Sequence, residues 1–138
     1  MRYLSIAIIL ILASSNASAW GWNAEKEATK AAKRDLSYSC SSYISLRTAR
    51  PERAEVYKNE ILKRDVFTGR DLRRVLDGRY GEGMSSKAWL CVFSTATLES
   101  ESVYGDKRLS PYKAPLWSSN LHATFIDDKL YSYTSIPF

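Results

Sequence analysis

The chain has 138 residues, of which 45% are hydrophobic and 25% are charged. This length suits one hydrophobic core, and the composition is close to the globular average, which excludes a disordered chain and a protein with several membrane spans. The net charge of +5 is modest, and both signs are mixed along the chain. Because no nucleic-acid-binding motif is present, we expect a single domain that binds no nucleic acid.

The first 19 residues have the layout of a secretory signal peptide. Arg2 supplies a positive charge, residues 3–13 form an apolar run, and Ala17-Ser18-Ala19 provides the small residues that precede a cleavage site. As a helix, the run would span ~17 Å, which is too short for a hydrocarbon core of ~30 Å. We therefore expect a signal peptide at residues 1–19 and one exported domain, periplasmic or secreted and without a transmembrane segment, at residues 20–138.

The two cysteines, Cys40 and Cys91, are expected to form a disulfide because an exported chain enters an oxidising compartment. On the loop-entropy model this bridge would stabilise the fold by ~4 kcal/mol. Two buried, unpaired thiols are the alternative. Two cysteines and a single histidine provide too few ligands for a recognisable metal site, and the sequence predicts no metal and no other cofactor.

A long helix is predicted from Asn23, a good N-cap residue, to a soft end near residues 46–50. Serines on both sides of Cys40 lower the helix propensity, so we expect the helix to fray or bend there. Its apolar residues recur at spacings of three and four, and this stripe is expected to face a sheet. The stripe consists of Ala28, Ala32, Leu36, Cys40 and Tyr43.

Two further helices are predicted in the first half of the chain. Pro51 fits the first turn of the second helix, in which the helical period continues to Leu62. Thr68 is the expected N-cap of a short third helix, and Gly78 its C-terminal stop. Residues 80–86 contain two glycines and are expected to form a turn.

The second half of the chain is expected to be mainly β-structure. Residues 88–93 are apolar on both sides and rich in β-forming residues, which predicts a buried strand. Residues 95–104 extend this strand or form a second one. Residues 106–119 contain two prolines and lack periodicity, so we expect a long surface loop. Residues 121–126 and 129–135 are predicted to be two strands, joined by a tight turn at the two aspartates between them.

Helices followed by a meander of antiparallel strands place the chain in the α+β class. We expect the N-terminal helices to pack on one face of a small sheet of three to four strands. In this arrangement Cys40 meets Cys91 on the inward side of the sheet, beside Trp89 and Phe93.

From residue 66 onward the pattern resembles a known envelope fold. Gly69 opens and Gly78 closes a short helix, Trp89 begins the sheet, and Phe125 leads into a turn at Asp127 or Asp128. This order is similar to the core of the small lipoprotein subunit of the outer-membrane β-barrel assembly machine (a BamE-like fold), and to the β-lactamase-inhibitor-protein repeat. The resemblance covers about half of the chain. It implies a binding or inhibitory scaffold in the cell envelope that acts by contact.

Three aromatic residues are candidates for a protein-binding surface. Tyr104, Tyr112 and Trp117 lie in the expected loop region among serines, prolines and basic residues. Large amphipathic rings in accessible loops are typical of protein-contact surfaces. The alternative is that these rings pack onto the sheet and close its core.

Four arginines on and just beyond the third helix form a local positive cluster. They are Arg70, Arg73, Arg74 and Arg79. One interpretation is an anion site for lipid phosphates, and the alternative is a solvated helix face with salt bridges to Asp71 and Asp77.

The sequence contains few residues for an enzyme. His122 is the single histidine, and no serine lies in a GxSxG motif. The carboxylate pairs at Asp127-Asp128 and at Glu99 with Glu101 are explained by turn chemistry and by solvated strand edges. The sequence therefore predicts no catalytic residue.

We therefore expect an exported, soluble bacterial envelope protein that binds another envelope or extracellular protein, in an assembly, inhibitor or immunity-like role. Two alternatives stay open. One is a small envelope hydrolase or toxin-like effector that uses His122. The other is a peripheral protein that binds anionic lipid head groups.

Overall fold

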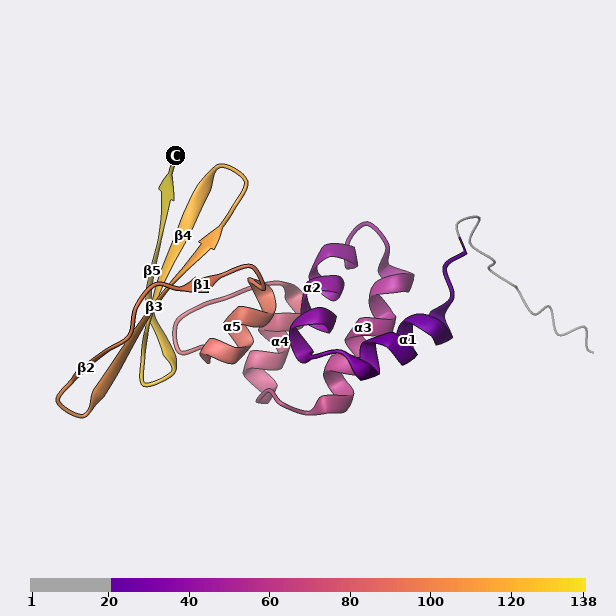
Figure 1. Ribbon diagram of the computed structural model, residues 1–138, viewed down its shortest axis with the longest axis horizontal. Helices are drawn as coiled ribbons and strands as arrows, with labels where there is room; N and C mark the ends of the chain where they lie inside the picture. Colours follow the sequence, from indigo (N-terminus) through magenta and orange to yellow (C-terminus); the bar gives the residue numbers. More distant parts are fainter. Residues whose placement is uncertain (1–20) are drawn as a thin grey trace, which may run out of the picture.

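The computed structural model describes residues 21–138. Five helices come first and an antiparallel sheet follows, which confirms the predicted α+β class (Figure 1). The signal peptide expected at residues 1–19 lies outside the described residues. Within residues 21–138, no helix combines the length and the hydropathy that crossing a bilayer requires.

The long N-terminal helix of the prediction is two helices, α1 (Ala24–Lys33) and α2 (Leu36–Leu46). Asn23 caps α1 as expected, but Asp35 caps α2 by accepting a hydrogen bond from the Tyr38 amide at 3.1 Å. An aspartate side chain satisfies a free amide at a helix start, so this residue favours a new helix over continuation of the first. The chain therefore breaks at Asp35 and not at the serines around Cys40.

This break changes which residues of the expected stripe are buried. Cys40 and Tyr43 in α2 are buried, but Ala28 and Ala32 in α1 are exposed, and Ala31 is buried in their place. The predicted stripe required one continuous helix, and the break between α1 and α2 changes which residues lie on the same face. Both helices pack on α3 and not on the sheet, which corrects the expected position of the stripe.

Helix α3 (Pro51–Arg64) begins at the predicted proline and holds α1 through polar contacts. The Tyr57 hydroxyl donates a hydrogen bond to the Glu27 carboxylate. Burial and this carboxylate raise the pKa of Tyr57 well above its usual value. The Arg64 guanidinium donates to the Ala31 carbonyl oxygen at 3.0 Å. These contacts connect the helices of the N-terminal layer.

Helix α4 (Gly69–Asp77) has the predicted ends. Thr68 is its N-cap, and Gly78 ends it in the left-handed region with φ 63°. A Cβ atom at Gly78 would lie 2.9 Å from the Arg47 guanidinium. Both the backbone angle and the close side chain favour glycine at this position.

The buried strand predicted at residues 88–93 is wrong, because this segment is helix α5 (Ser86–Val92). The Ser85 hydroxyl caps it by accepting from the Ala88 amide at 3.2 Å. The helix is apolar on several sides because it lies between the other helices and the sheet (Figure 1). A short apolar run does not distinguish a buried strand from a buried helix.

The sheet contains five strands in which all pairings are antiparallel. Strands β3, β4 and β5 form a meander, and the short strands β1 and β2 both pair with the other edge of β3. The strands are β1 (Thr97–Leu98), β2 (Ser102–Tyr104), β3 (Lys107–Pro115), β4 (Ser119–Ile126) and β5 (Lys129–Pro137).

Strand β3 occupies the segment for which a long surface loop was predicted, so that prediction is wrong. The Pro111 carbonyl oxygen accepts a hydrogen bond from the Glu99 amide at 2.9 Å. The ring nitrogen of Pro111 points to the same side of the strand, where the neighbouring chain is interrupted between β1 and β2. A proline is tolerated in a strand where no partner requires its missing N–H.

The predicted C-terminal hairpin is confirmed in β4 and β5. Its turn residues Asp127 and Asp128 both have positive φ, as a tight two-residue turn requires. The side chains of β4 alternate between buried and half-buried positions along the whole strand. The buried set, which includes Leu121, Ala123 and Phe125, faces α5 and forms the sheet side of the core.

The predicted disulfide between Cys40 and Cys91 is present, with their Cα atoms 4.9 Å apart. It joins α2 to α5. On the sheet side of α5, the Trp89 ring contacts the rings of Phe125 and Tyr112, at centroid distances of 5.5 and 5.9 Å. Helix α5 therefore connects the N-terminal helices to the sheet, through a covalent bond on one side and an aromatic cluster on the other.

Candidate functional site

The three candidate aromatic residues lie in different surroundings. Tyr112 belongs to the core, where its ring centroid is 5.4 Å from that of Phe125. Tyr104 ends β2 and is 68% exposed. Trp117 lies in the turn between β3 and β4 and is 100% exposed. Tyr104 and Trp117 are at opposite ends of β3, so the structure does not bring the three rings together.

Other apolar side chains lie near Trp117. Leu116 precedes it in the turn, and the Phe138 amide donates to the Ser118 carbonyl oxygen at 3.4 Å, which brings the end of β5 beside the turn. Phe138 is 81% exposed, and Ile136 is also exposed. We call Leu116, Trp117, Ile136 and Phe138 the apolar tip. Ile136 and Phe138 were not predicted, because their position depends on the strand register.

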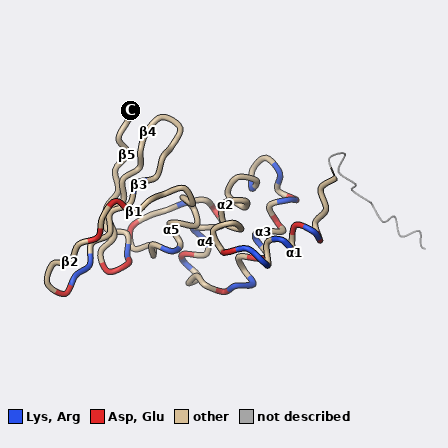
Figure 2. The backbone as a smooth tube through the Cα atoms, in the orientation of Figure 1, with Lys and Arg blue, Asp and Glu red and all other residues tan. Residues whose placement is uncertain are grey.

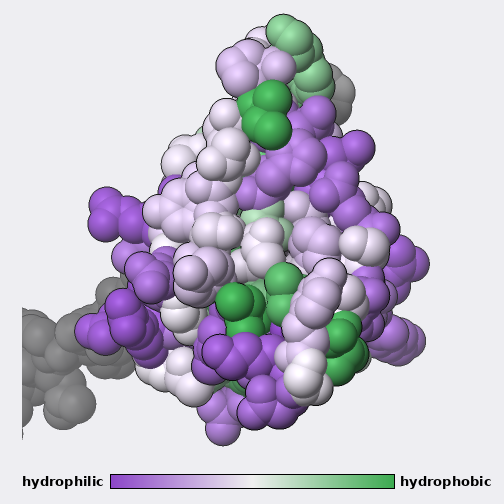
Figure 3. All heavy atoms as spheres, turned by 90° about the vertical axis from the view of Figure 1, so that its left-hand side faces the viewer, coloured by the Kyte–Doolittle hydropathy of each residue, from purple (hydrophilic) through white to green (hydrophobic). Residues whose placement is uncertain are grey.

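The end of the sheet that carries the apolar tip has no charged side chains. The sequence has no Lys, Arg, Asp or Glu in residues 114–121 or in residues 130–138. Figure 2 shows this contrast, because the strand ends near the C-terminus are uncharged whereas the turn beside β2 carries both signs. Figure 3 shows hydrophobic side chains at the upper end of the sheet face that is turned away from the helices. An uncharged, apolar end is suited to contact with another apolar surface.

The arginine cluster divides into one structural residue and three exposed ones. Arg74 donates to the carbonyl oxygens of Gly81 and Glu82, at 3.4 and 3.2 Å, and lies 3.9 Å from the Asp71 carboxylate. Asp71 in turn accepts from the Ser85 amide at 3.1 Å. These contacts hold the turn between α4 and α5.

Arg70, Arg73 and Arg79 are exposed. Among the described residues, none of these three forms an ion pair with Asp77, and the expected pairing with Asp71 is made by Arg74. Three exposed guanidinium groups remain available to an anionic partner.

His122 lies half-buried on the open face of the sheet. Its Nδ1 atom is 3.6 Å from the Glu99 carboxylate, and Thr134 is its cross-strand neighbour. Within residues 21–138, no hydroxyl forms a hydrogen bond with His122, and no cluster of His, Cys, Asp and Glu side chains could hold a metal ion. The structure thus places an acid beside His122 but no aligned nucleophile.

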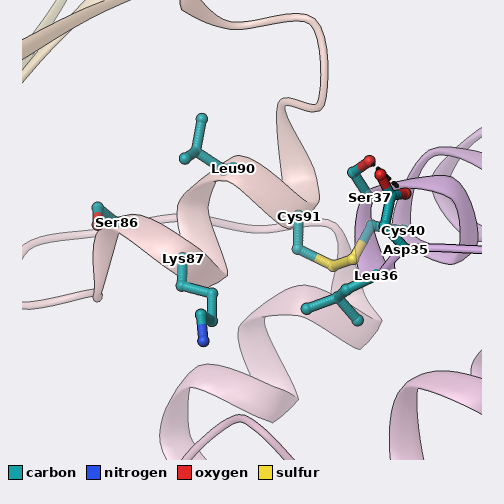
Figure 4. A pocket seen from close by; sticks show the side chains of 8 residues that line it. All are labelled: Asp35, Leu36, Ser37, Cys40, Ser86, Lys87, Leu90 and Cys91. Carbon is teal, nitrogen blue, oxygen red and sulfur yellow. Dashed lines mark hydrogen bonds between the residues drawn. A yellow bond between two sulfur atoms is a disulfide. The ribbon is translucent and has the colours of Figure 1, made fainter. Parts of the chain in front are cut away.

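A hollow of about 430 Å³ lies beside the disulfide, between the starts of α2 and α5. Figure 4 shows the bridge between the two helices, with Asp35 and Ser37 on one side and Lys87 on the other. The Ser37 hydroxyl donates to the Asp35 carboxylate at 2.8 Å, and this bond, with that from the Tyr38 amide, lowers the pKa of Asp35. This carboxylate is therefore engaged in capping α2. Pairing of the two cysteines was the one sequence signal that pointed to this position.

Searches against family models, curated proteins and solved structures found no match to the chain. Of the positions that carry the envelope-fold resemblance, Gly69 and Gly78 lie at the ends of α4 as expected, but Trp89 lies in α5 and does not begin the sheet.

Proposed function

We propose that this chain is an exported envelope protein, periplasmic or secreted, that acts by binding another envelope or extracellular protein through the apolar tip. The observation that carries this proposal is the complete exposure of Trp117 beside Phe138, which is 81% exposed. Burying a large apolar side chain is worth ~1.5–3 kcal/mol, and this gain is unused in the isolated chain. Tryptophan is also among the residues that contribute most to binding at protein interfaces.

The position of the tip also supports a binding role. Trp117 lies in a short turn between two long paired strands, and the start of the turn is closed by the bond from the Leu116 amide to the Ser119 carbonyl oxygen at 2.8 Å. A side chain on such a hairpin loses little backbone freedom when it binds. Export is supported by the disulfide between Cys40 and Cys91, because disulfides persist mainly in oxidising compartments.

Site-specific photo-cross-linking tests this function. The photoreactive residue p-benzoylphenylalanine is introduced at position 117, or at position 104 as a matched control in which another exposed aromatic residue at the opposite end of the sheet is replaced. After irradiation of intact cells, we expect one adduct of defined mass from position 117 and none from position 104. Equal adducts from both positions, or none from position 117, would contradict the proposal.

Binding to anionic lipid head groups is a second hypothesis, supported by the exposed side chains of Arg70, Arg73 and Arg79. Arg74 does not contribute to it, because its guanidinium is engaged by Gly81 and Glu82. Flotation with anionic lipid vesicles tests this hypothesis: salt-sensitive binding that is lost in the variant Arg70→Ala/Arg73→Ala/Arg79→Ala would favour it.

A further inference from the structure

The outer edge of β5 is an unpaired strand edge, and we propose that two copies of this chain associate by pairing these edges in an antiparallel manner. The two sheets would then form one continuous sheet across a two-fold axis. This inference is independent of the partner proposed for the apolar tip, because it rests on the backbone of β5.

The backbone contacts of β5 differ between its two edges. One edge pairs with β4 from Lys129 to Pro137, with a β-bulge at Tyr131, which has no partner residue in β4. On the other edge, Leu130 donates to the Met84 carbonyl oxygen and accepts from the Gly83 amide, both at 2.8 Å. From residue 131 to residue 137, no described residue forms a backbone hydrogen bond with this outer edge. Because alternate residues of this segment bond to β4, the residues between them, which include Tyr133 and Ser135, present free backbone donors and acceptors on the outer edge.

The side chains of this segment do not protect its edge. Proteins commonly block an open edge with lysine, with other charges or with proline. Residues 130–138 contain no charged residue, and their one proline, Pro137, is at the end of the strand. Tyr131 and Tyr133 are 65% and 47% exposed, and both residue types favour β-structure.

The opposite edge of the same sheet is protected. There the chain is divided into β1 and β2, which pair over only two and three residues. Glu99 and Glu101 lie between them, and the Glu101 carboxylate pairs with Arg108 at 3.1 Å. Because one edge carries these features and the other lacks them, the open edge of β5 is a specific feature of this sheet.

The composition of β5 favours a second copy as the occupant of the edge. If the two-fold axis passes through Tyr133, the two Tyr133 residues face each other, and Ser132 of each copy faces Thr134 of the other. Aromatic pairs and hydroxyl pairs across strands are stabilising, and this register opposes no like charges. A two-fold interface of this kind is self-complementary. It would also place the two apolar tips at opposite ends of the joined sheet.

Sedimentation equilibrium of the purified, oxidised protein from micromolar to millimolar concentration tests the proposal. We expect a reversible monomer–dimer equilibrium. The variant Ser132→Lys/Thr134→Lys places positive charges opposite each other in the dimer, so we expect its self-association to be at least about tenfold weaker. The variant Ser132→Glu/Thr134→Glu is expected to be equally defective. An equimolar mixture of the two variants restores the dimer, which also shows that both are folded.

Two controls separate the edge from other surfaces. Thr95→Lys/Ser100→Lys adds the same charge at exposed positions near β1 and is expected to leave the dimer unchanged. Trp117→Ala alters the apolar tip and is also expected to leave it unchanged. A monomeric wild type at millimolar concentration, undiminished association of the doubly lysine-substituted β5 variant, or loss of the dimer on Trp117→Ala would overturn the proposal.

Discussion

Tyr112 and Trp117 lie close together in the sequence, but their side chains serve different purposes. Both were candidates for a binding surface, because the composition of residues 104–119 suggested a loop. The structure places Tyr112 on the inner face of β3, against Trp89 and Phe125, and Trp117 in solvent beyond the end of the strand. The alternation of side chains between the two faces of a strand places Tyr112 on the inner face. This rule could not be used for prediction while the segment was expected to be a loop.

This difference leads to a prediction at the scale of single residues. Tyr112→Ala removes a ring from the aromatic cluster, so we expect the free energy of unfolding to fall by about 2–3 kcal/mol. Trp117→Ala removes a fully exposed ring, so we expect the free energy of unfolding to change by less than ~0.5 kcal/mol. Urea unfolding of the two variants measures these changes.

The effects of these two substitutions on partner binding are expected to be in the reverse order to their effects on stability. Trp117→Ala should weaken capture of the cross-linked partner by more than about tenfold, because a central tryptophan at an interface contributes ~2 kcal/mol or more. Tyr112→Ala should bind normally under conditions in which it remains folded. Normal binding by Trp117→Ala would remove the apolar tip from the proposed function.

At the scale of elements, end signals in the sequence predicted α3 and α4, whereas the N-cap Ser85 of α5 was missed beside an apolar run. Pro51, Thr68 and Gly78 define α3 and α4 correctly, because capping is local chemistry. The segments assigned to the wrong element are α5 and β3. Their structure depends on burial between two layers and on a gap in the neighbouring strand, and neither is visible in a local pattern.

The cap at Asp35 also explains why α1 and α2 are separate, and it gives a pH prediction. The hydrogen bonds from the Ser37 hydroxyl and the Tyr38 amide lower the pKa of this carboxyl in the folded chain. Its contribution to stability is therefore fully present above the unfolded pKa of ~3.9 and is lost as the pH falls through the lower, folded pKa.

The variant Asp35→Asn isolates this effect, because asparagine also caps a helix but does not titrate in this range. We expect the difference in unfolding free energy between wild type and Asp35→Asn to favour the wild type near neutral pH and to shrink on acidification below pH ~4. Urea unfolding over a series of pH values measures it. A difference that stays constant down to the acid limit would show that the charge of Asp35 plays no part.

At the scale of the whole molecule, the N-terminal helices and the sheet are joined through α5. Of the five helices, α5 carries both the bond to Cys40 and the Trp89 ring that packs on the sheet. The apolar tip is at the far end of the sheet from the β4–β5 turn, which lies beside the start of α5. The disulfide joins α5 to α2, whereas Trp89 of α5 packs on the sheet, so the disulfide is expected to act on stability alone.

The last prediction tests this separation. Cys40→Ala/Cys91→Ala removes a bridge between residues 51 positions apart, so we expect the free energy of unfolding to fall by about 2–4 kcal/mol. Urea unfolding of the variant and of reduced wild type should give similar losses, because both lack the same bond. Cross-linking from position 117 is expected to persist in the variant to the extent that it remains folded. If folded variant lost this cross-link, the disulfide would be part of the binding mechanism, and a purely structural role for the cysteines would be wrong.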